Sequence, residues 1–152
     1  MFDTVVIATD GSESAERAIT VALDLATKFD AAVHALYVVD SGDIDGSPEP
    51  LREEMETALT EAGEDALATI EDRSDHEIVT AVREGQPATE ISQYVREVDA
   101  DVLATGTRGR HGEHSFLLGS VAEAVVRRCP VPVLTVRQLD ESEEPTLERR
   151  RP

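Results

Sequence analysis

The chain has 152 residues, of which 40% are hydrophobic, and 32 acidic residues against 14 basic ones give a formal net charge of −18. This length is typical of one domain with a proper core, and the hydrophobic share excludes wholesale disorder. A surface this acidic repels nucleic-acid phosphates and anionic membranes, so we expect neither as a partner.

The chain shows no sign of membrane insertion or secretion. No apolar run approaches the ~20 residues that span a bilayer, and residues 1–4 lack the basic region of a signal peptide. The single cysteine, Cys129, cannot form an internal disulfide, and its place at a predicted helix end is typical of a buried structural thiol. We therefore expect a cytoplasmic protein.

The first quarter of the chain predicts a strand, a turn and a helix. Residues 4–9 are a continuous β-branched run, typical of a central strand of a parallel sheet. The turn 10–12 follows, and Ser12 is suited to cap the next helix. The inner stripe of that helix has helical spacing and comprises Ala15, Ala18, Ile19, Ala22, Leu23, Ala26 and Phe29.

A second apolar run predicts a strand over residues 33–39. Residues 41–50 are rich in Gly, Ser, Asp and Pro and predict a loop. A long surface helix is expected over residues 51–73, although Gly63 weakens it slightly. Its expected apolar stripe comprises Leu51, Met55, Leu59, Ala62, Ala66 and Ile70.

The second half repeats the alternation. The side chains of residues 77–83 alternate between the two faces of a strand, and charged residues flank the run, so we expect an edge strand. Pro87 fits the first turn of the helix that follows. The expected inner face of that helix comprises Ala88, Ile91, Tyr94, Val95 and Val98.

The last elements are a fourth strand over residues 102–105, a helix over residues 120–129 that ends before Pro130, and a fifth strand over residues 131–136. Pro132 indicates that this strand is an edge or begins there. The domain is therefore expected over residues 1–137, with a flexible charged tail over residues 138–152.

Strands alternating with helices predict a doubly wound α/β fold, with a parallel sheet and helices on both faces. In such sheets the ligand lies at the carboxyl ends of the strands, where the strand order reverses. Three strand ends carry suggestive residues, at positions 10–12, 38–40 and 106–109. If the first and fourth strands are neighbours, their ends face each other across a crevice.

The most informative pattern is Gly106-x₂-Gly109-x₉-Gly119-Ser120, between the fourth strand and the last helix. A helix start has unpaired N–H groups and partial positive charge, which suits phosphate, and glycine allows close approach of the backbone. The alternative is that these glycines have only a structural role, in two tight turns and a helix cap. The P-loop, the GxGxxG dinucleotide fingerprint and the GxSxG serine elbow are all absent from the sequence.

Together with Thr9-Asp10-Gly11-Ser12 and Val38-Val39-Asp40, this glycine spacing resembles the ATP-binding branch of the universal stress protein (UspA-like) family. The resemblance runs from about Phe2 to Arg137. It implies a single five-stranded parallel sheet of order 3-2-1-4-5, in the adenine nucleotide alpha hydrolase-like class of folds.

The resemblance also implies a nucleotide site for ATP, AMP or ADP, with Mg²⁺ or Mn²⁺ held by the phosphates rather than by the protein. Val38 would hold the adenine, Thr9 and Asp10 would lie near the nucleoside, and Thr105 and Gly106 would approach the ribose. The phosphates would be held by Gly109, Gly119, Ser120 and Val121. Asp10 has an alternative role as a turn residue, and Arg108 and Arg110 either neutralise phosphate or balance nearby acids.

Other polar residues have simpler roles. His111, Glu113 and His114 lack a third strong metal ligand, so no metal site is expected there. Packing or surface positions suffice for His34 and His76, and the chain's tyrosines are expected in the core.

No catalytic residue is expected, because no general base or nucleophile–base pair stands out. The expected function is a nucleotide-dependent regulator of the stress response with at most slow ATP hydrolysis. It is expected to be a homodimer joined through the edge strand 133–136. The alternatives are a slow ATPase or nucleotidyl-transfer enzyme of the same fold, and an interaction module without nucleotide.

The charge predicts a halophilic protein. At roughly 1 M salt the Debye length is only about 3 Å, so repulsion among the acidic residues is screened. We expect the free energy of unfolding to rise with KCl concentration, and the circular dichroism spectrum to lose structure in low-salt buffer. A chain that keeps all of its structure at low salt would contradict the halophilic interpretation.

Overall fold

The computed structural model describes residues 2–107 and 118–139 of the chain. The elements follow one another in the order β1 (Thr4–Thr9), η1 (Glu13–Ala15), α1 (Glu16–Phe29), β2 (Ala32–Asp40), α2 (Ser41–Asp45), η2 (Glu49–Leu51), α3 (Arg52–Arg73), β3 (Ile78–Gly85), α4 (Pro87–Glu97), β4 (Val102–Gly106), α5 (Ser120–Arg128) and β5 (Val133–Val136).

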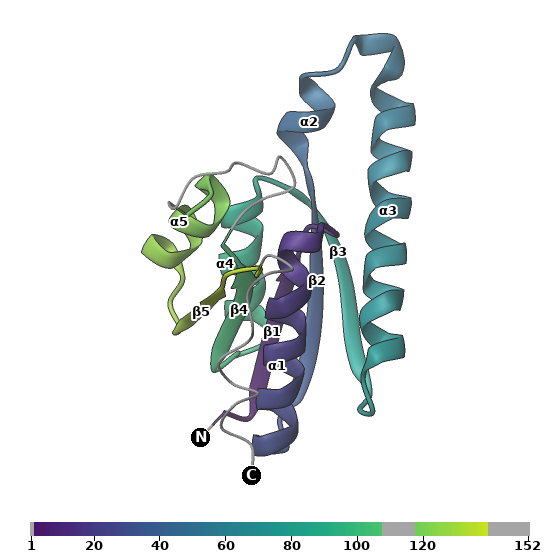
Figure 1. Ribbon diagram of the computed structural model, residues 1–152. Helices are drawn as coiled ribbons and strands as arrows, with labels where there is room; N and C mark the ends of the chain where they lie inside the picture. Colours follow the sequence, from purple (N-terminus) through teal and green to yellow (C-terminus); the bar gives the residue numbers. More distant parts are fainter. Residues whose placement is uncertain (1, 108–117, 140–152) are drawn as a thin grey trace.

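The five strands form one parallel sheet of order β3-β2-β1-β4-β5, which confirms the expected fold (Figure 1). The strand order reverses at β1, because the chain first moves outward to β2 and β3 and then returns to β4 on the other side. A crevice between the carboxyl ends of β1 and β4 is the usual ligand position in such a sheet.

Alternate residues of the central strands supply two separate cores, since successive side chains of a strand point to opposite faces. On one face, α1 and α3 cover a core that includes Val5, Ile7 and Tyr37. On the other face, α4 and α5 cover a core that includes Val6 and Leu36. Five of the six residues of β1 are buried, which fits its place in the middle of the sheet.

The prediction of a loop over residues 41–50 is wrong in part, because this segment contains α2 and the start of η2. The carboxylate of Asp40 accepts the N–H of Gly42 at 2.9 Å and so caps α2. The Gly, Ser and Asp composition indicates a turn, but it also suits a short capped helix.

The long helix α3 is confirmed, but its apolar stripe is predicted wrongly at Ala62, which is exposed, and at its start. Leu51 is 48% exposed and Met55 is 37% exposed, because the first turns of α3 project beyond the carboxyl edge of the sheet (Figure 1). The residues of α3 that are buried are Leu59, Gly63, Leu67 and Ile70. Similarly, Phe29 ends the predicted stripe of α1 but is 44% exposed and meets Phe2 edge to face.

The C-terminal edge matches its prediction. β5 begins at Val133, directly after Pro132, and lies at the edge of the sheet beside β4. Beyond it, the side-chain oxygen of Gln138 accepts the N–H of Arg17 at 3.1 Å, so the first residue of the expected tail contacts α1. Residues 140–152 of that tail lie outside the described residues.

Gly63 has a packing role that its sequence context does not indicate. It lies in α3 directly against the ring of Tyr37, and a Cβ built at this position would come within 2.4 Å of the Cδ1 atom of that ring. Tyr37 is only 2% exposed and cannot swing into solvent without opening the core. The close contact between α3 and β2 therefore depends on a missing side chain.

We expect Gly63→Ala to lower the free energy of unfolding by about 1 to 3 kcal/mol, because the added methyl group overpacks the core. Helix propensity alone predicts the opposite, a gain of about 1 kcal/mol. Urea unfolding measures the difference, with Ala68→Gly at an exposed position of the same helix as the control for propensity. A more stable Gly63→Ala protein would contradict the packing role.

Candidate functional site

Five of the predicted site residues lie together at the carboxyl edge of the sheet. Thr9 ends β1 and Asp10 follows it, while Thr105 and Gly106 end the neighbouring strand β4, in a register that pairs Ile7 with Ala104. Val38 lies near the end of β2, on the other side of β1. The parallel pairing thus gathers residues that are far apart in the sequence.

The turn after β1 is held by its own side chains. The Oδ1 atom of Asp10 accepts the N–H of Ser12 at 2.9 Å and its hydroxyl at 2.5 Å. The hydroxyl oxygen of Thr9 accepts the N–H of Gly11, whose φ of 79° is in the left-handed region that favours glycine. Ser12 therefore does not cap the helix with its side chain, contrary to expectation, and Asp10 does have the structural role of a turn residue.

Gly106 is packed against the backbone. A Cβ built there would lie 2.7 Å from the carbonyl oxygen of Ser14, in the first turn of η1. A side chain would push η1 away from the end of β4. This glycine is therefore needed for packing, whatever else approaches it.

The start of α5 lies next to the end of β4. The N–H of Gly119 donates to the carbonyl oxygen of Thr107 at 2.7 Å and joins the two ends of the intervening segment. The next three N–H groups, of Ser120, Val121 and Ala122, have no acceptor within residues 2–107 and 118–139, as is usual in the first turn of a helix. Within the described part of the chain, this helix start therefore presents three backbone donors of the kind that suit an anion.

Part of the predicted site cannot be placed. Gly109, the arginines Arg108 and Arg110 and the candidate metal ligands His111, Glu113 and His114 lie outside the described residues. The geometry of the site therefore rests on the strand ends and on the start of α5.

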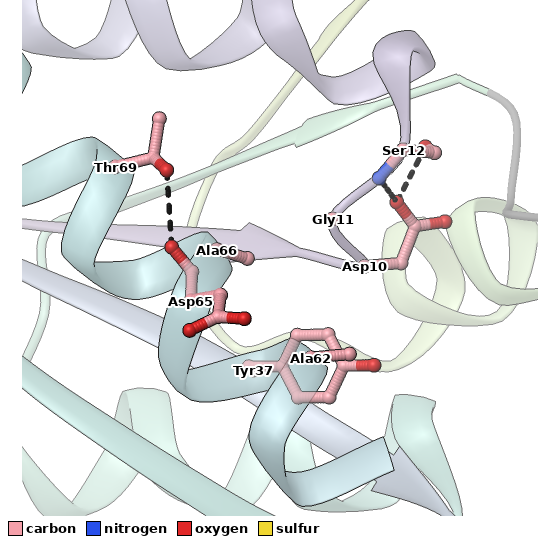
Figure 2. A pocket seen from close by; sticks show the side chains of 8 residues that line it. All are labelled: Asp10, Gly11, Ser12, Tyr37, Ala62, Asp65, Ala66 and Thr69. Carbon is pink, nitrogen blue, oxygen red and sulfur yellow. Dashed lines mark hydrogen bonds between the residues drawn. The ribbon is translucent and has the colours of Figure 1, made fainter. Parts of the chain in front are cut away.

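A pocket of about 440 Å³ opens between α3 and the turn after β1 (Figure 2). It lies on the α1–α3 side of the sheet, whereas the side chain of Val38 packs on the α4–α5 side. Its lining residues are Asp10, Gly11, Ser12, Tyr37, Ala62, Asp65, Ala66 and Thr69. Sequence motifs point to the turn but not to Asp65 and Thr69, which look like ordinary residues of a solvated helix face.

Comparison with known proteins identifies the family of the chain. Residues 1–137 match the model of the universal stress protein family. The chain belongs to that family. A universal stress protein of Methanocaldococcus jannaschii is 37% identical over 142 residues, covering 91% of this chain and 84% of the relative.

Solved structures show the same fold. The structure of hypothetical protein MJ0577, whose biochemical function was assigned from its structure, superposes with a TM-score of 0.81 at 26% identity and covers 93% of this chain and 99% of that one. A universal stress protein in complex with cAMP has a TM-score of 0.65 at 26% identity and covers 90% of this chain and 97% of that one.

Two further properties of this universal stress protein bear on its partners. The described residues contain no group of three or more His, Cys, Asp or Glu side chains that could hold a metal ion. Within the same residues, no helix has the length and apolarity to cross a bilayer.

Near α2, neighbouring acidic residues change the pKa of one carboxyl group. Desolvation, together with the neighbouring carboxylates of Glu56 and Asp45, raises the pKa of Glu84 at the end of β3. Like charges at close range disfavour ionisation, so the carboxyl group of Glu84 holds its proton to a higher pH than an isolated glutamate.

His34, His76 and Tyr94 lie away from the strand ends and helix start that form the candidate site. The Nδ1 atom of His34 lies 2.9 Å from the hydroxyl of Tyr94, whose ring also faces the guanidinium of Arg83 at 5.3 Å. Burial lowers the pKa of His34, and burial also raises the pKa of Tyr94, with Glu97 adding to the rise and Arg83 opposing it. His76 is exposed, as expected for a surface role.

His34 should make stability depend on pH. Because its pKa in the folded chain lies below the ordinary 6.5, the unfolded chain binds more protons in the interval below that value, and the free energy of unfolding falls as the pH decreases through it. We expect the wild-type protein to lose stability relative to His34→Asn between about pH 7.5 and pH 5.5. Urea unfolding across this range measures the difference, and a difference independent of pH would contradict the assignment.

Proposed function

We propose that this universal stress protein binds an adenine nucleotide, ATP or its relatives ADP and AMP, and acts as a nucleotide-dependent regulator of the stress response. The observation that carries the proposal is the start of α5 beside the carboxyl end of β4, where three N–H groups lack an acceptor among the described residues. The helix dipole adds partial positive charge at this point.

In this proposal the phosphates lie against the first turn of α5. The N–H groups of Ser120 and Val121 and the Ser120 hydroxyl donate to phosphate oxygens. Gly119 contributes space rather than a donor, since its N–H is bonded to Thr107. Each hydrogen bond contributes about 1 kcal/mol net, so micromolar affinity, about 8 kcal/mol, needs several of them together with burial of the base.

The nucleoside lies across the ends of the strands. Val38 holds the adenine through its backbone, Thr9 and Asp10 lie beside the nucleoside, and Thr105 and Gly106 approach the ribose. Gly109 belongs to the phosphate site by family resemblance. A divalent ion, Mg²⁺ or Mn²⁺, neutralises phosphate charge when bound, and in this proposal its protein contacts are few.

The related universal stress protein in complex with cAMP supports an adenine nucleotide as the class of ligand. An enzyme is less well supported, since the hydroxyl–carboxylate pair at the described strand ends, Ser12 with Asp10, already serves to hold the turn after β1. A slow ATPase or nucleotidyl-transfer enzyme of this fold is the alternative, and the rate of ATP turnover separates it from a binding protein.

We also propose that the protein works in the cytoplasm of a salt-loving cell and forms a homodimer through β5. β5 is an edge strand with partly buried apolar side chains, and such an edge readily pairs with its symmetry mate. In high salt, screening of the charge of −18 lets both a second acidic copy and an anionic nucleotide approach.

We expect Gly119→Val to abolish ATP binding and to leave the fold intact. The backbone of Gly119 has φ −61° and ψ 159°, which any residue adopts, so valine fits the chain but places its methyl groups against the phosphates. Isothermal titration calorimetry with ATP in high salt measures the affinity, and circular dichroism checks the fold.

Unchanged affinity in Gly119→Val would show that the helix start is only a structural turn. Mass spectrometry of small molecules released from the purified wild-type protein provides an independent test, because a nucleotide held by several hydrogen bonds is expected to survive purification.

A further inference from the structure

The pocket between α3 and the β1 turn has the opposite electrostatic character to the start of α5. Figure 2 shows the carboxylate of Asp65 on the α3 side and that of Asp10 on the turn side, with the ring of Tyr37 between them in the lower part of the view. Among the described residues, no lysine, arginine or histidine lines the pocket. An anion placed here would be repelled by both carboxylates.

Most of the polar groups of this pocket can only accept hydrogen bonds. The hydroxyl of Thr69 already donates to the backbone oxygen of Asp65 at 3.0 Å, and the hydroxyl of Ser12 already donates to Asp10. The carboxylate of Asp65 has no hydrogen-bond or ion-pair partner among the residues that the structure describes. Apart from the hydroxyl of Tyr37, the pocket thus offers mainly acceptors, which suits a ligand that supplies hydrogen-bond donors.

The start of α5 follows β4 and this pocket includes the turn after β1, so both lie at the carboxyl edge of neighbouring strands of the sheet. A nucleotide has a matching polarity, because its phosphates only accept hydrogen bonds at neutral pH, whereas its ribose hydroxyls and the exocyclic amine of adenine donate them. The two surroundings thus suit the two ends of one molecule.

We infer that Asp65 of α3 accepts a hydrogen bond from the nucleoside end of the bound nucleotide, from a ribose hydroxyl or the adenine amine, and so sets its orientation. This inference rests on the proposed function and adds a specificity-determining residue to it. A carboxylate is a strong acceptor for a sugar hydroxyl, as in dinucleotide-binding folds.

A simple effect of charge would act in the opposite direction. Removing any carboxylate near the site reduces repulsion of the triphosphate and should tighten binding. The adjacent residue Glu64 is exposed, lies on the same helix and does not line the pocket. Glu64→Ala is therefore a matched control for Asp65→Ala, with the same loss of charge and a similar change in helix propensity.

The experiment is titration calorimetry of the full chain with ATP in high salt. We expect Asp65→Ala to weaken ATP binding about tenfold, because a charge-assisted hydrogen bond is lost, whereas Glu64→Ala binds ATP as tightly as wild type or more tightly. Thermal unfolding should show that both variants are folded.

Nucleotide analogues identify the donor. The wild-type protein should bind either 2′- or 3′-deoxy-ATP less tightly than ATP if a ribose hydroxyl donates, or inosine triphosphate less tightly if the amine donates. In Asp65→Ala that difference should disappear.

The outcomes separate the two proposals. ATP affinity within about twofold of wild type in Asp65→Ala, or discrimination among the analogues that persists in that variant, overturns the role of Asp65 while nucleotide binding stands. Equal affinity of the wild-type protein for ATP and all three analogues also overturns the role of Asp65 while nucleotide binding stands. A wild-type protein that binds no nucleotide overturns the proposed function, and the role of Asp65 with it.

Discussion

The position of β1 between β2 and β4 is the constraint on which the rest of the structure depends. Parallel pairing on both sides brings the ends of three strands to one edge, and the reversal of strand order leaves room there for the start of α5. Burial of β1 on both faces requires an apolar strand, so the polar groups of this region are confined to its final residues and to the turn. Core packing and the candidate site are thus set by the same strand.

Much of the fold could be predicted from the sequence, because apolar runs and helical stripes alternate clearly. The errors have local causes. Asp40 caps a short helix where composition suggests a loop, and periodicity cannot reveal that Leu51 and Met55 lie on turns of α3 that leave the sheet. The role of Gly63 was hidden for a similar reason, since its neighbour Tyr37 is close only in three dimensions.

The candidate site could be predicted where it follows a strand end or a helix start, because those positions carry recognisable turn and glycine residues. Its details depend on tertiary contacts that no local pattern encodes. The N–H of Gly119 donates to the carbonyl oxygen of Thr107. Asp65 lines the pocket only because α3 passes beside the turn after β1. In both cases the missing information was which distant segment lies next to the residue.

The close approach of Gly106 to the backbone of Ser14 affects how the glycine pattern is interpreted across the family. Evolution would keep this glycine in a descendant that had ceased to bind any ligand, because folding alone demands it. The presence of a glycine at this position is therefore weak evidence for ligand binding when relatives are classified by motif. A glycine whose backbone angles any residue could adopt, such as Gly119 at the helix start, is the better guide to which family members have kept a ligand.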